Sequence, residues 1–99
     1  MQLRVSGKQM EIGSALPEAV RAKLEGAIGK HFDGHVEANV VFSHEGAFYR
    51  ADVTAHLGTG IVLKSEGTGN DAYRAFDGAL ERLEKQVERH SRKLKNHHP

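Results

Sequence analysis

The side chains with the clearest chemical potential are the lysines and arginines near the end of the sequence. Residues 82–99 hold six basic and two acidic side chains, a net charge of +4, together with three histidines. Residues 1–81 hold eight basic and 11 acidic side chains, a net charge of −3, so the overall charge of +1 hides a basic end. A local excess of positive charge attracts polyanions such as nucleic acid. The last fifth of the chain is therefore predicted to bind a polyanion.

Helical spacing separates the side chains of this basic end into three bands. At about 100° per residue, one stripe of a helix beginning near residue 71 is mostly apolar. The stripe comprises Ala72, Phe76, Ala79, Leu80, Leu83, Val87, His90 and Leu94. The far flank carries the cations Arg74, Arg82, Lys85, Arg89, Arg92 and Lys93. A narrower band beside them carries Asp77, Glu81, Glu84 and Glu88. Segregated charge of this kind favours binding along an extended polyanion.

An ordinary solvated helix face is the alternative interpretation of the same charges. Glu81 lies four residues before Lys85, and Glu88 four before Arg92, which is the favoured orientation for pairing on a helix. Each pair stabilises a helix by about 0.2–0.5 kcal/mol without any ligand.

The periodicity of the whole chain predicts the element order β-α-β-β-β-α. Expected strands lie near residues 3–7, 36–43, 47–57 and 61–66, and expected helices at about 14–32 and from 70 or 71 onward. Ser14 and Asn70 or Asp71 are the expected helix caps. An antiparallel sheet with both helices on one face leaves the other face solvated. Phe48 is the one ring expected to point outward on the central hairpin, so that face is no platform for stacking bases.

Several classes of chemistry find no support. Without cysteine there is no disulfide scaffold or thiol nucleophile, and a cytoplasmic location is expected. We expect neither an enzyme nor a cofactor or small-molecule substrate, because no catalytic set is spaced together. Asp33-Gly34 separates His31 from His35, so no metal site is expected. No stretch of about 18 apolar residues and no signal-peptide pattern is present, so no membrane association is expected.

A glycine-rich segment before the last helix has the spacing of a phosphate-binding turn. Residues 67–72 match G-x-G-x-x-A, but a dinucleotide-binding unit needs a second parallel strand after its helix, and the sequence stops there. Gly67 and Gly69 are therefore interpreted as turn residues that relieve backbone strain.

Longer runs of residues carry a family resemblance. The run Asp71–Asp77 (DAYRAFD) leads into Leu83–Arg89 (LEKQVER) and Arg92–Lys95 (RKLK). Together with Val5–Lys8 and Lys30–Asp33 near the start, these runs make essentially the whole chain similar to the ribosome hibernation-promoting factor family, also called ribosome-associated inhibitors or subunit-interface proteins.

The resemblance implies an α+β fold in which a four-stranded sheet carries two helices on one face, similar to double-stranded RNA binding domains. It implies a protein that occupies the decoding channel of the small ribosomal subunit, excludes messenger and transfer RNA, and inhibits translation in stationary phase or stress. Carried onto this sequence, the RNA-facing residues are Lys23, Lys30, Lys85, Arg89, Arg92 and Lys93, to which the helical spacing adds Arg74 and Arg82. Tyr73 and Asp77 are expected to support the helix.

We therefore predict a single ribosome-binding domain over residues 1–95 and a disordered tail over 96–99, with the small subunit and its ribosomal RNA as partners. A general double-stranded RNA binding module is one alternative. A protein-interaction domain that dimerises through its sheet edge or polar face is another. Long members of the family carry a linker and a further domain, so the sequence is either a short form or the N-terminal domain of a long one.

Salt dependence tests whether these cations contact phosphates. If about six of them do, the logarithm of the binding constant should fall with the logarithm of salt concentration with a slope of about −4 to −5. Fluorescence anisotropy of a labelled RNA across a salt series measures the slope. A slope near zero would show that the charges are only a solvated face.

Overall fold

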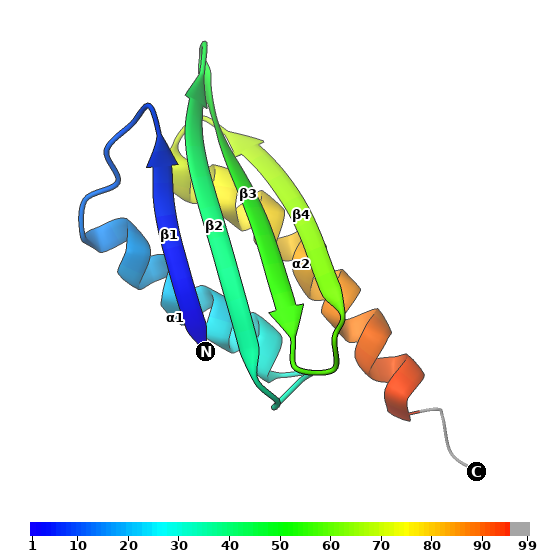
Figure 1. Cartoon of the computed structure of the whole chain (residues 1–99). Helices are drawn as coiled ribbons and strands as arrows, with labels where there is room; N and C mark the ends of the chain where they lie inside the picture. Colours follow the sequence, from blue (N-terminus) through cyan, green and yellow to red (C-terminus); the bar gives the residue numbers. More distant parts are fainter. Residues whose placement is uncertain (96–99) are drawn as a thin grey trace.

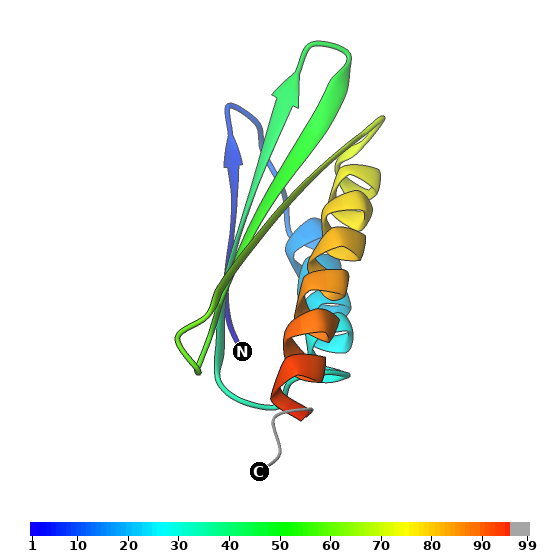
Figure 2. The same ribbon diagram turned by 90° about the vertical axis from the view of Figure 1, so that its right-hand side faces the viewer.

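A four-stranded sheet covered on one side by two helices makes up the structure. The computed structural model describes the backbone of residues 1–95 and the side chains of residues 1–91. Figure 1 shows the elements and Figure 2 the two layers. The elements are β1 (Gln2–Lys8), α1 (Ala15–Gly29), β2 (Val36–Glu45), β3 (Phe48–Leu57), β4 (Val62–Gly69) and α2 (Ala72–Lys95). The predicted order of elements is confirmed, whereas the predicted tail at 96–99 lies outside the described residues.

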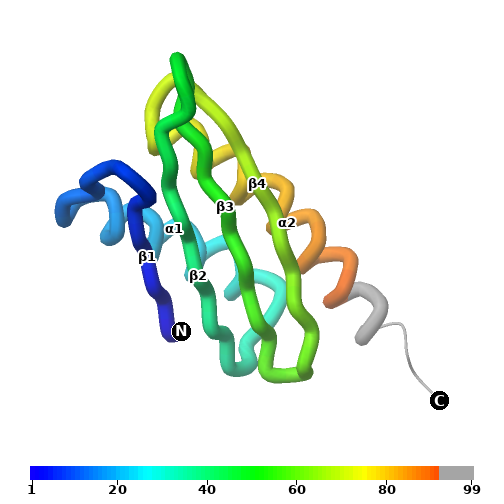
Figure 3. Tube along the Cα trace, turned by 45° about the horizontal axis from the view of Figure 1, so that its top comes forward, coloured from blue at the N-terminus to red at the C-terminus, as the bar shows by residue number. Residues whose placement is uncertain are grey.

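The strands lie in the order β1-β2-β3-β4, which the trace in Figure 3 follows from one edge to the other. β2, β3 and β4 pair antiparallel, as predicted, but β1 pairs parallel with β2. The prediction of a wholly antiparallel sheet is wrong at this edge. Because α1 crosses over between β1 and β2, the chain enters both strands from the same end, and such a crossover connects parallel strands.

Alternation of side chains fixes the register of the sheet. Val40 lies opposite both Val5 and Val53, and Phe42 lies opposite Ala51. Val40, Phe42 and Val53 are at most 1% exposed and meet Phe76 and Leu83 of α2 in one core. A one-residue slip would turn these apolar side chains to the open face. The core therefore sits between the sheet and the helices, and the other face of the sheet stays polar.

The ends of the two helices agree with the prediction only in part. α1 ends at Gly29, three residues earlier than expected, and in the turn that follows the N–H groups of both His31 and Phe32 donate to the carbonyl of Ile28. Ser14 occupies the capping position of α1 but makes no side-chain hydrogen bond there. Asp71 caps α2 as predicted: its Oδ1 accepts the N–H of Arg74 at 2.9 Å.

Gly67 and Gly69 are not turn residues, which corrects the earlier interpretation. Both lie within β4, and the glycines with positive φ are elsewhere, at positions 13, 46 and 60. A Cβ on Gly67 would lie 2.3 Å from the carbonyl oxygen of Ala75 and 2.4 Å from the amide nitrogen of Ala79. A Cβ on Gly69 would lie 2.7 Å from the Cβ of Arg74. These glycines let the backbone of α2 approach β4 closely, which sets the position of the helix.

Replacing Gly67 tests this close approach. We expect Gly67→Ala to destabilise the fold by about 1–3 kcal/mol, because a methyl group there overlaps helix backbone that cannot move independently. Gly26→Ala is the matched control, since a Cβ at Gly26 meets nothing within 4 Å and Gly26 lies inside α1. Alanine there should stabilise by about 0.5–1 kcal/mol. Urea denaturation measures both, and equal stability of the two variants would contradict the close packing of α2 on β4.

Candidate nucleic-acid interface

Helix α2 is held on the sheet by its apolar stripe. Phe76, Ala79, Leu83 and Val87 are buried against β3 and β4, as their spacing predicts. Ala72, Leu80 and His90 of the same stripe are half-buried, and the side chain of Leu94 lies outside the described residues. Ala75 and Ser91, which the predicted stripe omits, are also buried. With this face covered, the two charged bands of α2 must lie on opposite flanks.

Two members of the acidic band, Asp77 and Glu84, pair with cations of α1 and of the residues just after it. Lys23 Nζ lies 2.7 Å from Asp77 Oδ1, and Lys30 Nζ lies 3.7 Å from Glu84 Oε2. His31 Nε2 is also 3.7 Å from Glu84 Oε2. Asp77 therefore joins the two helices, while Tyr73, one turn earlier, is 44% exposed. The charges of Lys23 and Lys30 are therefore balanced locally by carboxylates of α2 across the seam between the helices.

The other flank of α2 runs along the outer edge of β4. Arg82 Nη1 donates to the carbonyl of Glu66 at 2.9 Å, and Gln86 Nε2 donates to the carbonyl of Lys64 at 2.7 Å. Ser65 Oγ donates to the carbonyl of Ala79 at 2.8 Å. β4 is an edge strand, and the two α2 side chains cap carbonyls that have no further strand to bond them. These bonds hold Arg82 and Gln86 in place before any ligand arrives.

Between this flank and β4 the surface is hollowed by a depression of about 600 Å³. We call it the α2–β4 notch. It is lined by Leu63, Arg82, Lys85, Gln86, Arg89 and His90. No carboxylate is among these lining residues. Lys85 Nζ is 3.6 Å from Glu81 Oε1 in an exposed pair, which is too weak to cancel its charge. The notch is therefore a concave site whose charged lining residues are all positive.

The predicted RNA-facing cations thus divide among several places. Arg82, Lys85 and Arg89 are brought together at the α2–β4 notch. Lys23 and Lys30 lie at the seam between the helices, and Arg74 Nε is 3.6 Å from Asp71 Oδ2 at the start of α2. The side chains of Arg92 and Lys93 lie outside the described residues. Helical spacing missed Gln86, although its place between the apolar stripe and the cations indicated a side chain facing the sheet edge.

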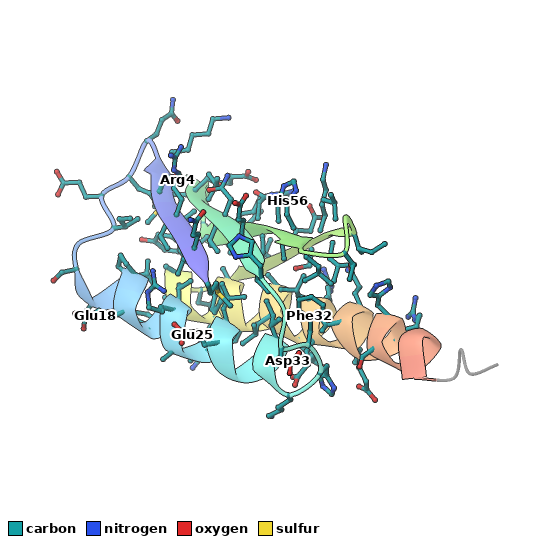
Figure 4. The ribbon with its side chains drawn as sticks, turned by 60° about the horizontal axis from the view of Figure 1, so that its bottom comes forward. Arg4, Glu18, Glu25, Phe32, Asp33 and His56 are labelled. Atoms are coloured by element: carbon teal, nitrogen blue, oxygen red, sulfur yellow. The ribbon has the colours of Figure 1, made fainter. Side chains whose placement is uncertain are left out.

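The open face of the sheet has mixed charge, as expected. Figure 4 shows Arg4 and His56 on this face, away from the helices. Arg50 binds Asp52 through two nitrogens, at 3.0 and 3.1 Å, and also pairs with Glu66 on β4. The hydrogen bond and charge of Asp52, with the charge of Glu66, raise the pKa of Arg50. Because its central charges neutralise one another, this face is a poorer polyanion surface than the notch.

Two further structural observations bear on other classes of site. Within the described residues, His, Asp and Glu side chains form no group of three or more able to hold a metal ion. No helix in the part of the chain that the structure describes is long and apolar enough to cross a membrane.

Comparison with known proteins adds sequence relatives. Residues 3–95 match the pattern of the family described as Sigma 54 modulation protein / S30EA ribosomal protein. The chain is 44% identical over 98 residues to the ribosome hibernation promotion factor of Rhizobium meliloti (strain 1021), covering 99% of this chain and 52% of that protein. It is 36% identical over 97 residues to the ribosome hibernation promoting factor of Escherichia coli (strain K12), covering 98% of this chain and 100% of that protein. The chain thus spans about half the length of the Rhizobium relative.

Solved structures share the fold. The N-terminal domain of Protein Y from Thermus thermophilus superposes with a TM-score of 0.83 at 34% identity, covering 91% of this chain and 99% of that one. A ribosomal subunit interface protein from Coxiella burnetii superposes with a TM-score of 0.80, covering 93% of this chain and 99% of that one. At 19% identity the second likeness shows the fold alone.

A double-mutant cycle tests the pairing of α1 with the acidic band. We expect Lys23→Gln and Asp77→Asn to show a coupling energy of about 0.2–1 kcal/mol, because the pair is close but roughly half exposed. The coupling should shrink in about 1 M salt, which screens exposed charges. Lys23→Gln combined with Glu11→Gln is the control and should be additive. Absence of coupling between positions 23 and 77 at low salt would show that the seam is not held by charge.

Proposed function

Because the chain belongs to the Sigma 54 modulation protein / S30EA ribosomal protein family, we propose that it is a ribosome hibernation domain that binds the small ribosomal subunit through ribosomal RNA. Relatives named ribosome hibernation factors support this proposal. The Escherichia coli relative is matched over its full length.

The observation that carries the RNA part of the proposal is the clustering of Arg82, Lys85 and Arg89 at a notch with no acidic lining residue. Carboxylates on α2 would repel phosphates, but Asp77 is turned toward Lys23 of α1 and Glu84 toward Lys30, just after that helix. A-form RNA is bound largely through its phosphates and 2′-hydroxyls, and a rigid helix flank of this kind can follow such a backbone. Lys23, Lys30, Arg74, Arg92 and Lys93 are proposed as additional contacts.

The proposed mechanism is steric and electrostatic. The domain occupies the decoding channel of the small subunit, where its volume excludes messenger and transfer RNA, and phosphate contacts hold it there. No bond is made or broken, so the protein acts without catalysis, cofactor or small-molecule substrate. Translation stays inhibited for as long as the domain is bound, as in stationary phase or stress. A ribosome-bound factor of this kind works in the cytoplasm.

Co-sedimentation with purified small subunits tests the proposal. We expect the protein to pellet with small subunits at low salt and to be released as salt rises. Lys85→Gln combined with Arg89→Gln should weaken binding about tenfold and reduce the magnitude of the salt slope by about 1.4–1.8, because two phosphate contacts are lost. Added messenger or transfer RNA should compete with the protein for the subunit.

The matched control removes two positive charges from another part of the surface. Arg4→Gln combined with Lys8→Gln on β1 changes the net charge equally and should leave the slope unchanged. Absence of the wild-type protein from the small-subunit fraction at low salt would refute the proposal. Equal affinity for a plain RNA duplex and for small subunits would instead identify a general double-stranded RNA binding module.

A further inference from the structure

The tip of the β2–β3 hairpin carries a pair of stacked rings that the fold covers only in part. His44 and Tyr49 lie opposite each other on the two strands, and their ring centroids are 4.3 Å apart with planes 4° from parallel. Both lie on the side of the sheet that carries the helices, because they continue the alternation of the buried Phe42 and Ala51. Figure 2 shows the hairpin extending beyond the start of α2, so the helix layer leaves its tip open.

Tyr49 anchors this pair and His44 presents it to solvent. Tyr49 is half-buried and packs against the core, whereas His44 is exposed. One side of the imidazole lies on Tyr49, so the exposed area of His44 is on its outer side and rim. Gly46 and Ala47 join the two strands, and Gly46 has the positive φ that tight hairpin turns favour. The turn and the core therefore hold the rings in place before any ligand binds.

A cation lies close to the other end of the pair. Tyr49 is opposite Gly69 on β4, and a Cβ on Gly69 would be 2.7 Å from the Cβ of Arg74. The base of the Arg74 side chain is therefore one strand away from Tyr49. Its side chain is 73% exposed, and its pair with Asp71 at 3.6 Å is exposed and weak. Arg74 can therefore turn to a ligand that lies on the rings.

The carboxylate that follows these rings in the sequence is turned away from them. Glu45 comes directly after His44 on β2, so strand alternation places its side chain on the open face of the sheet. There it lies opposite Phe48. The helix side of the tip therefore presents an aromatic surface with an adjacent cation.

We propose that the His44–Tyr49 pair is a stacking platform for one unpaired base of the bound RNA, with Arg74 contacting a phosphate of the same strand. This inference rests on the proposed function and adds to it a second contact surface that selects single-stranded RNA. Bases inside a duplex are already stacked on both sides, whereas an unpaired base has a free face that His and Tyr rings can cover. Arg74 lies eight residues before Arg82, about 12 Å along α2, so one RNA strand can reach both the hairpin and the α2–β4 notch.

The ring and the cation contribute to binding in different ways. Stacking needs no charge, so His44→Ala should lower the affinity for RNA with an unpaired base at least about fivefold and leave the salt slope unchanged at about pH 8. Arg74→Gln should instead reduce the magnitude of the slope by about 0.7, the value for one contact with a single strand. His44→Phe retains a ring and should keep most of the affinity.

Two RNA probes test the platform. One is a blunt duplex of about 16 base pairs, and the other is the same duplex with a single-stranded overhang of about four nucleotides that contains 2-aminopurine. Wild-type protein should bind the overhang probe more tightly and quench its fluorescence. His44→Ala should lose both effects yet bind the blunt duplex normally, which a folding defect would not produce.

His56→Ala is the matched control, since His56 is an exposed strand histidine on the open face of the sheet, and it should behave as wild type with both probes. Equal wild-type affinity for the two probes overturns the inference. Quenching that His44→Ala leaves unchanged also overturns it.

Purified small subunits separate this inference from the proposed function. Wild-type protein should co-sediment with them, and less His44→Ala protein should pellet at the same salt concentration. Subunit binding that His44→Ala leaves unchanged would overturn the inference and leave the proposed function standing. Weaker subunit binding by His44→Ala with no effect on the overhang probe would assign the rings to a protein of the subunit and overturn their assignment to RNA. Absence of wild-type binding to subunits would overturn both.

Discussion

The close contact between α2 and β4 is the constraint on which the rest of the structure depends. Gly67 has no side chain, so the backbone of the helix can rest almost directly on the strand at Ala75 and Ala79. Ser65 then bonds the carbonyl of Ala79 and fixes the helix along the strand. A helix held this way can neither roll nor slide without losing these contacts. Its rotation decides which charged side chains meet α1, which meet the edge of the sheet and which meet solvent.

The rotation of α2 about its axis places each charged band in different surroundings. Asp77 meets Lys23 of α1 and Glu84 meets Lys30 just after that helix, and these exposed pairs add little to stability. The larger effect of these pairs is on the electrostatic potential at the notch. Carboxylates placed beside α1 do not line the notch, so they do not lower its positive potential directly. A net charge of +1 for the whole chain is therefore compatible with a strongly positive local site.

The side chains of the basic flank serve the fold as well as the proposed interface. Arg82 and Gln86 bond carbonyls along the free edge of β4, and this covers backbone groups with which another chain would otherwise pair. The same bonds limit the freedom of these side chains, so less conformational entropy is lost when a ligand binds beside them. Lys85 and Arg89 have long side chains that are exposed. They can adjust to a ligand next to the fixed side chains of Arg82 and Gln86.

The sequence by itself determined the order of elements, the buried stripe of α2, the separation of its charges and the family to which the chain belongs. Periodicity and local charge are properties of neighbours along the chain, so they can be read without knowing the fold. The parallel pairing of β1, the role of Gly67, the diversion of Lys23 and Lys30 to acidic partners, and the bonds of Gln86 were decided only by the tertiary structure. Each of these depends on two segments meeting across the core, and the distance between such segments is set by packing rather than by sequence spacing.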